Sequence, residues 1–254
     1  MKELVTILIP VLDQNLSPFE IKVIQNTINK LNRYPIIFLC AEGTVLNPVL
    51  PQTTKIEVQY FPEKYFKSPK SFSKLLLINE FYERFSWTES ILIQHLNSWI
   101  VKDELHYWCK QGYDYLTSAP IARLNPKVSW LQRIVGLSPE LNQKVGLAYA
   151  GCGLSLLFTE PALNTINKNK KEAHKLRNSE NIPNAESVFW NTIPNRILPS
   201  LRKPTRVVQD YFAKHVLNLD GSKYLTVEKL PFALTGVKTE NELASILKET
   251  NHTW

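Results

Sequence analysis

The chain has few cysteines, no apolar run that could cross a bilayer and none of the common glycine-rich nucleotide loops. Its three cysteines are sparse and odd in number, which does not make a disulfide framework and favours a reducing compartment. No stretch approaches the ~20 apolar residues that a membrane span needs. The opening run MKELVTILIPVLDQN lacks a small-residue cleavage site, so it predicts a buried first strand and not a signal peptide. These absences predict a cytoplasmic protein.

Several classes of chemistry have little support. No G-x-x-x-x-G-K or G-x-G-x-x-G motif follows the first strand, and no nucleophile elbow supports a Ser/His/Asp triad. His106 and Cys109 lie three residues apart on one expected helix, but no second pair exists to complete a zinc site. Cys152 lies between two glycines, where a small buried side chain is a more common role than a reactive thiol.

The charge balance points to an anionic partner. The chain has 254 residues, 44% of them hydrophobic, and a formal net charge of +7. The length and the hydrophobic fraction are enough to bury a core. The positive charge favours binding of an anionic partner, such as a nucleotide diphosphate, an anionic glycan or membrane surface, or nucleic acid. The excess is concentrated in Lys168–Arg177 and Leu201–Arg206, whose ordinary interpretation is a solvated helix face plus a basic loop. Neither segment contains an aromatic residue, so nucleic acid is disfavoured.

The N-terminal third has the pattern of a β-α-β unit. Leu4 to Leu12 is an almost continuous apolar run, typical of a strand buried on both faces. Ser17-Pro18-Phe19-Glu20 predicts a helix start with a serine cap, a proline at the first position and a glutamate three residues after the cap. A second apolar strand is expected at Ile36 to Cys40, which implies a right-handed parallel crossover.

The rest of the chain alternates between the two patterns. Because no repeat or low-complexity linker appears, we expect one α/β domain over residues 1–254, with a mixed, mostly parallel sheet, helices on both faces and a basic, helical extension from about residue 194. Further expected strands are Ile56–Phe61, Ser90–His95, Tyr113–Thr117 and the end of Val145–Phe158. Further helices are expected to begin near Phe72, Asp103, Thr159, Asn184, Val207 and Glu240. The sequence of residues 121–144 predicts an irregular segment, and that of Leu230–Gly236 predicts a compact turn.

The stretch from Glu89 to Pro120 is where a binding site is expected. Its strand delivers Gln94, His95, Leu96 and Asn97 to its carboxyl end, and ligands of open α/β sheets bind at that edge. A second candidate segment is Tyr149 to Leu157, the only place with two close glycines, Gly151 and Gly153.

Seven motifs resemble a known family in their order and spacing, from residue 5 to about 236. They are VTILIPVLDQNLSPFE, PIIFLCAEG, KYFKSPKSFSKLLLINEFYERF, ILIQHLNSWIVKDELHYWCKQGYDYLTSAP, GCGLSL, ESVFW and LPFALTG. Together they resemble bacterial glycosyltransferases of surface-polysaccharide gene clusters, a group of small single-domain enzymes with a GT-A-like (Rossmann-like) fold.

The resemblance implies a nucleotide-sugar donor, with UDP as the expected type, and a glycan or lipid-linked saccharide as acceptor. Glu186 is the implied catalytic base. The implied donor-binding residues are Pro10, Val11, Asp13, Lys70, Lys74, His95, Asn97, Gly151 and Gly153. Lys67, Lys70 and Lys74 would supply positive charges that bind the diphosphate. The basic segments would attach the protein to the inner face of an anionic membrane.

The chain departs from the family pattern at four functional positions. Asn97 stands where the family has its metal-site aspartate, Leu157 replaces an arginine, Ser187 an acidic residue and Thr235 a histidine. Asparagine is a poor substitute for a carboxylate on Mg²⁺ or Mn²⁺, so no metal ligand is assigned. Mg²⁺ or Mn²⁺ stays open as the cofactor that the resemblance implies.

Three functions therefore remain open. The chain is a transferase that works without the metal, or a catalytically inert protein of the same fold that binds a glycan, a nucleotide or a partner transferase. The third alternative is a basic adaptor that binds acidic polysaccharide or membrane through residues 168–206.

Overall fold

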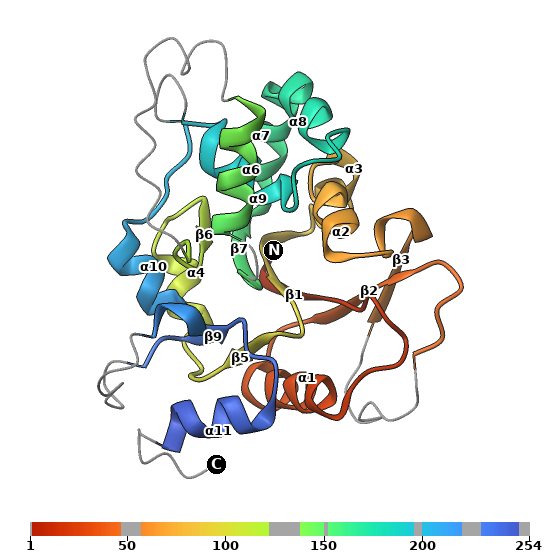
Figure 1. Ribbon diagram of the computed structural model, residues 1–254. Coiled ribbons are helices and arrows are strands. Elements are labelled where there is room, and N and C mark those ends of the chain that lie inside the picture. The colour runs from red at the N-terminus through yellow and green to blue at the C-terminus, as the bar shows by residue number, and fades with distance from the viewer. Residues whose placement is uncertain are drawn as a thin grey trace.

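The larger of two β-sheets forms the centre of the molecule (Figure 1). The computed structural model describes residues 2–46, 57–121, 138–149, 152–195, 200–219 and 230–248. Six described strands have the order β3-β2-β1-β4-β7-β6. Strands β3, β2, β1 and β4 are parallel, and β7 runs antiparallel to both of its neighbours, β4 and β6. The mixed, mostly parallel sheet of the sequence prediction is confirmed. The strands are β1 (Glu3–Pro10), β2 (Ile36–Ala41), β3 (Glu57–Phe61), β4 (Thr88–Gln94), β6 (Tyr115–Thr117) and β7 (Leu154–Phe158).

The first β-α-β unit forms as its sequence pattern predicts. Successive apolar residues of β1 point to opposite faces, so Leu8 packs into one core and Ile7 and Ile9 into the other. Helix α1 (Pro18–Leu31) begins with a reciprocal cap, in which the Ser17 backbone N–H donates to the Glu20 carboxylate at 2.8 Å and the Glu20 N–H donates to the Ser17 hydroxyl at 3.3 Å.

Helices cover both faces of this sheet. On one face the core is shared with α2 (Pro69–Leu75), α3 (Asn79–Arg84), α6 (Pro139–Ala148), α7 (Thr159–Lys168), α8 (Lys170–Arg177) and α9 (Ala185–Thr192). On the other face it is shared with α1, α4 (Leu105–Lys110) and α10 (Arg206–Phe212). Among the described helices, none is both long and apolar enough to span a membrane.

A second, three-stranded sheet brings the C-terminal part of the chain to the end of β4. Strand β9 (Ala233–Thr235) pairs antiparallel with β5 (Ser98–Ile100) and parallel with β8 (Ala213–His215). After β9, the Val237 N–H donates to the Asn97 carbonyl at 3.1 Å. Helix α11 (Glu240–Lys248) then packs Leu243 and Leu247 into a third, smaller core. Two 3₁₀ turns, Glu63–Tyr65 and Val216–Asn218, complete the described elements.

Several sequence-based element predictions are wrong. The turn expected at 230–236 contains strand β9, because its apolar residues pair with β5. In that pairing Ala233 lies opposite Ile100, which is 133 residues earlier in the chain, so only the tertiary fold brings the two strands together. The irregular region expected over 121–144 ends in helix α6, which Ser138 caps by accepting from the Leu141 N–H; residues 122–137 lie outside the described part. The single helix expected after Phe72 is two, α2 and α3, and the one expected at 207–216 ends at Phe212.

Candidate functional site

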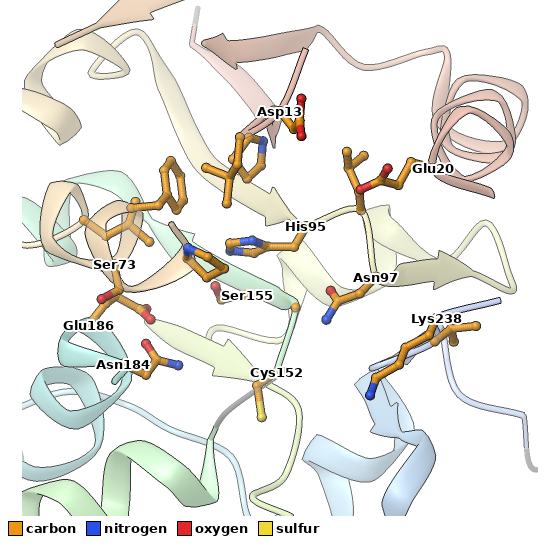
Figure 2. Close-up of a pocket in the computed structure, with 18 of the residues that line it drawn as sticks. Asp13, Glu20, Ser73, His95, Asn97, Cys152, Ser155, Asn184, Glu186 and Lys238 are labelled. Atoms are coloured by element: carbon orange, nitrogen blue, oxygen red, sulfur yellow. The ribbon is translucent and has the colours of Figure 1, made fainter. Parts of the chain in front are cut away.

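A cavity of about 560 Å³ opens at the carboxyl ends of β1 and β4 (Figure 2). Its volume lies within the range of small-molecule sites, and its position is the edge at which α/β sheets bind ligands. Its polar lining residues are Asp13, Ser17, Glu20, Ser73, His95, Asn97, Ser155, Asn184, Glu186 and Lys238; Pro10, Leu12, Phe19, Pro69, Phe72, Leu76, Leu96, Cys152, Gly153, Pro183 and Val237 complete the lining.

The turn after β4 is held from inside the protein. The buried Gln94 carboxamide donates to the Thr27 hydroxyl at 2.7 Å and to the Ser98 carbonyl at 3.0 Å. The His95 backbone N–H donates to the Gly153 carbonyl at 2.8 Å. Because three separate segments fix this turn, His95 and Asn97 stand in the cavity wall in defined positions.

Gly153 is required by the close approach of Asn97. A Cβ atom at position 153 would lie 1.9 Å from Asn97 Oδ1 and 2.5 Å from Ser98 Oγ. The Ser98 hydroxyl also donates to Asn97 Oδ1 at 3.4 Å. The carboxamide oxygen of Asn97 is therefore packed against backbone and a neighbouring hydroxyl.

Lys238 enters the cavity from the C-terminal loop and is not among the site residues that the sequence predicts. The loop leaves β9 through Gly236, whose φ of +78° favours glycine, and the bond from the Val237 N–H to Asn97 anchors it. The Lys238 N–H donates to the Glu242 carboxylate at 2.8 Å. No local pattern distinguishes this lysine from the other exposed lysines, since only the pairing of β9 with β5 brings it to the site.

Glu186 lies on the opposite side of the cavity, in the first turn of α9 (Figure 2). The predicted cap is confirmed, since the Asn184 side chain accepts from the Ser187 N–H at 3.4 Å. Only 6% of Glu186 is exposed; the Ser187 hydroxyl donates to Oε2 at 3.1 Å, and Oε1 has no hydrogen-bond partner among the described residues. Burial raises the pKa of Glu186 to about 7, while the Ser187 hydroxyl acts in the other direction.

His95 and Cys152 are both uncharged at neutral pH. The His95 ring packs edge-on against Phe72, with ring centroids 5.4 Å apart, and loss of water around it lowers its pKa to about 4. Burial likewise raises the pKa of Cys152 to about 12, so its thiol stays protonated. Both are therefore hydrogen-bonding or packing groups in the wall.

The structure brings most of the sequence-predicted site residues together. Pro10, Asp13, His95, Asn97, Gly153 and Glu186 line the cavity. Val11 does not; it is 2% exposed, packs in the core and donates its N–H to the Leu39 carbonyl. Lys70 and Lys74 are also absent from the lining, and the Lys70 ammonium donates to the Glu180 carbonyl. Gly151 lies outside the described residues.

The described side chains do not fit a divalent cation. The Asp13 carboxylate accepts from the Asn15 N–H at 2.8 Å, and Glu20 caps α1. Glu186 stands on the opposite side, and the Asn97 oxygen is held by Ser98. Within the described ranges, no group of three or more His, Cys, Asp or Glu residues could hold a metal. Mg²⁺ is commonly held by one or two carboxylates together with substrate phosphates, and the carboxyl groups of this cavity do not converge on one point, since Glu186 lies apart from Asp13 and Glu20 (Figure 2).

The model of one protein family matches residues 55–234, more than half of the chain. The description of the family is "Protein of unknown function (DUF5672)". The chain belongs to the DUF5672 family. No curated protein matches this DUF5672 chain in sequence.

Solved structures similar to this DUF5672 chain are glycosyltransferases. The galactosyltransferase LgtC, in complex with donor and acceptor sugar analogs, has a TM-score of 0.56 at 9% identity, over 98% of this chain and 97% of that one. Mouse xyloside xylosyltransferase 1 has a TM-score of 0.50 at 12% identity, over 86% and 89%. A glycosyltransferase involved in the glycosylation of the major capsid of PBCV-1 has a TM-score of 0.50 at 11% identity, over 96% and 98%. The DUF5672 chain therefore has the GT-A glycosyltransferase fold.

Proposed function

We propose that this protein is a glycosyltransferase that binds a nucleotide sugar in the cavity and transfers the sugar to a glycan or lipid-linked saccharide. The observation that carries the proposal is the pairing, across one cavity of a GT-A fold, of a cation, Lys238, with a buried carboxyl group, Glu186. The resemblance of the sequence motifs supports a UDP-type donor and a role in bacterial surface polysaccharide biosynthesis.

Lys238 is the group best suited to the diphosphate. It lines the cavity on the same side as Asn97, and an ammonium group forms charge-assisted hydrogen bonds with phosphate oxygens. During transfer the bond between the sugar and the diphosphate breaks, and negative charge develops on the departing phosphate oxygen. A fixed cation stabilises that charge without a metal ion. Asp13, in the loop after β1, is exposed and lines the cavity, and the resemblance of the sequence motifs supports a contact between it and the nucleoside.

Glu186 has the properties of the base. Its pKa of about 7 means that both protonation states are populated near neutral pH, which is the condition under which a general base is most effective. The unpartnered Oε1 would take the proton of the acceptor hydroxyl as that oxygen forms its new bond to the sugar carbon. The proton remains on Glu186 until product release, so the protons balance.

A second candidate is a non-catalytic binding protein of the same fold. It is favoured by the replacement of the metal-site aspartate by Asn97, whose oxygen is occupied by Ser98 and Gly153. Such a protein binds the nucleotide or a glycan without breaking the sugar–phosphate bond.

One panel tests the proposal and separates the two candidates. UDP, GDP and several nucleotide sugars are added to the protein in EDTA, and the unfolding temperature and the release of free nucleoside diphosphate are measured. A raised unfolding temperature with release that Glu186→Gln abolishes supports the transferase. Stabilisation without release in the presence of sugar acceptors supports the binding protein. If no nucleotide raises the unfolding temperature, with or without Mn²⁺, a nucleotide-sugar site is excluded.

A further inference from the structure

Two polar side chains that line the cavity beside Glu186, Ser73 and Asn184, make their hydrogen bonds within the protein. The Ser73 hydroxyl donates to the Lys70 carbonyl at 2.9 Å and accepts from the Ala185 N–H at 3.2 Å. The Asn184 carboxamide donates to the Tyr149 carbonyl at 3.2 Å while its oxygen caps α9. Glu186 Oε1 is the buried oxygen in this group that has no partner among the described residues. A ligand in this part of the cavity therefore meets one unsatisfied acceptor.

Among the described residues, no positive charge contributes to the pKa of Glu186. The titratable groups that interact with it are Tyr82 on α3, Tyr115 on β6 and Cys152 before β7. Burial raises the pKa of each, well above its usual value for the tyrosines and to about 12 for the thiol, so all three are neutral at neutral pH. Of the described residues, only Ser187 lowers the pKa of Glu186, and it does so through a neutral hydroxyl.

This side of the cavity lies across from Lys238 (Figure 2). If the diphosphate binds Lys238, the sugar attached to it extends into the cavity toward Ser155 and Glu186. A sugar hydroxyl can donate a hydrogen bond to the open oxygen of Glu186. A sugar carboxylate would instead place a second negative charge beside a buried carboxyl group, with no cation among the described residues to balance it.

We propose, on the basis of the proposed function, that Glu186 makes the site selective for sugars without an acidic group. The transferred sugar is then a neutral sugar and not a uronic acid. Glu186 acts here as a specificity-determining residue, in addition to its proposed role in proton transfer.

Binding of UDP, UDP-glucose and UDP-glucuronate to the full chain, measured by isothermal titration in EDTA, tests this selectivity. The two sugars differ only in the acidic group at C6. We expect UDP-glucose to bind at least ~10-fold more tightly than UDP-glucuronate at pH 8, because like charges that are brought together without water between them repel strongly. The preference should shrink at pH 6, where Glu186 is protonated, and the Glu186→Gln variant should reduce it at pH 8.

The matched control is Asp13→Asn, which removes a carboxylate from another part of the lining. That variant can change the affinity for UDP, but it should not change the ratio of the affinities for UDP-glucose and UDP-glucuronate. If UDP-glucose and UDP-glucuronate bind equally well at pH 8, or if Glu186→Gln does not change the ratio of their affinities, the inference is overturned and the proposed function still stands. Absence of UDP binding overturns the proposed UDP site and the inference with it. If Glu186→Gln does not fold, the change of the wild-type ratio between pH 6 and pH 8 decides.

Discussion

Glu186 and Lys238 line the same cavity in opposite environments. Glu186 is buried in the first turn of a helix, and Lys238 is exposed on a loop that follows a short strand. Burial makes the protonation state of Glu186 sensitive to pH near neutrality, while exposure leaves Lys238 able to meet an incoming anion. The two residues therefore lead to different kinds of prediction, one of stability and one of affinity.

Replacement of Lys238 by methionine should weaken UDP binding by about 10-fold or more. A hydrogen bond to a charged group contributes about 1.5–3 kcal/mol, and each 1.4 kcal/mol corresponds to a factor of about ten in affinity. Isothermal titration measures the change. The matched variant is Lys74→Met, a lysine that sequence reasoning assigned to the diphosphate but that does not line the cavity. A larger loss at Lys74 than at Lys238 would restore the sequence-based assignment.

Glu186 should make the protein less stable as pH rises. Its pKa is about 7 in the folded protein and near 4.3 in an unfolded chain, so between these values the folded state binds more protons. Stability from this group is fully present below about pH 4 and is lost as pH rises through 7, with a total of about 4 kcal/mol.

Urea unfolding of wild type and Glu186→Gln at pH 5 and pH 8 measures this dependence. The free energy of unfolding of the variant, relative to wild type, should rise by about 3 kcal/mol between the two pH values. An exposed carboxylate on α3, replaced in Glu80→Gln, serves as the control and should show no such trend. Parallel pH profiles for wild type and Glu186→Gln would show that Glu186 is not buried as described.

At the scale of secondary-structure elements, the site depends on the loop between β9 and α11. Gly236 has φ +78°, and a Cβ atom there would lie 2.3 Å from Nε2 of the buried His215 on β8. The loop therefore packs against its own sheet before it presents Lys238. Its position is set jointly by backbone conformation and by packing.

Gly236→Ala and Gly43→Ala separate these two contributions. Gly43 has φ +84°, but a Cβ atom there would meet nothing within 4 Å. Gly43→Ala should cost about 1 kcal/mol from backbone conformation alone. Gly236→Ala should cost about 3 kcal/mol because overpacking against His215 adds to that cost, and it should also weaken UDP binding. Chemical denaturation of both variants gives the difference, and equal losses of stability would mean that His215 does not pack as described.

The elements that the sequence predicted well are those with local signals. The cap at Ser17 and Glu20 and the cap at Asn184 each involve residues within four positions of one another, so the sequence alone contains the evidence. Strand β9 has no such signal, because its partner is β5, far earlier in the chain.

The absence of Lys70 and Lys74 from the cavity lining has a similar explanation. Sequence spacing shows that Lys70 and Lys74 share a face of α2, but not which face meets the cavity. In the structure, α2 contributes Pro69, Phe72 and Ser73 to the cavity lining, and its C-cap residue Leu76 also lines the cavity. The face of α2 that carries Lys70 and Lys74 is therefore not the face that lines the cavity. Sequence reasoning therefore found the carboxyl-end edge of the sheet and Glu186, whereas Lys238 required the tertiary fold.

At the scale of the whole molecule, one helix carries a cluster of exposed lysines. Lys168, Lys170, Lys171 and Lys175, at the end of α7 and along α8, are all exposed. A basic surface of this kind is attracted to anionic lipid headgroups, at about 1 kcal/mol for each lysine near the membrane.

Vesicle sedimentation should therefore detect binding to phosphatidylserine vesicles at low salt but not to neutral vesicles. Binding should fall at about 0.5 M salt, because screening shortens the range of the attraction between the exposed lysines and the anionic headgroups. Replacement of the four lysines by glutamine should remove it without a change in the unfolding temperature. Binding that is unaffected by salt or by the four substitutions would exclude α8 as an electrostatic contact.

The central claim is that the cavity at the ends of β1 and β4 binds a nucleoside diphosphate through Lys238, without a metal ion. Isothermal titration of UDP into the full chain, once in EDTA and once in Mn²⁺, tests it most directly. We expect binding in EDTA with an affinity that Mn²⁺ changes by less than about twofold, since 0.4 kcal/mol is small beside one charged hydrogen bond. Binding that appears only with Mn²⁺, or that Lys238→Met leaves unchanged, would contradict the claim.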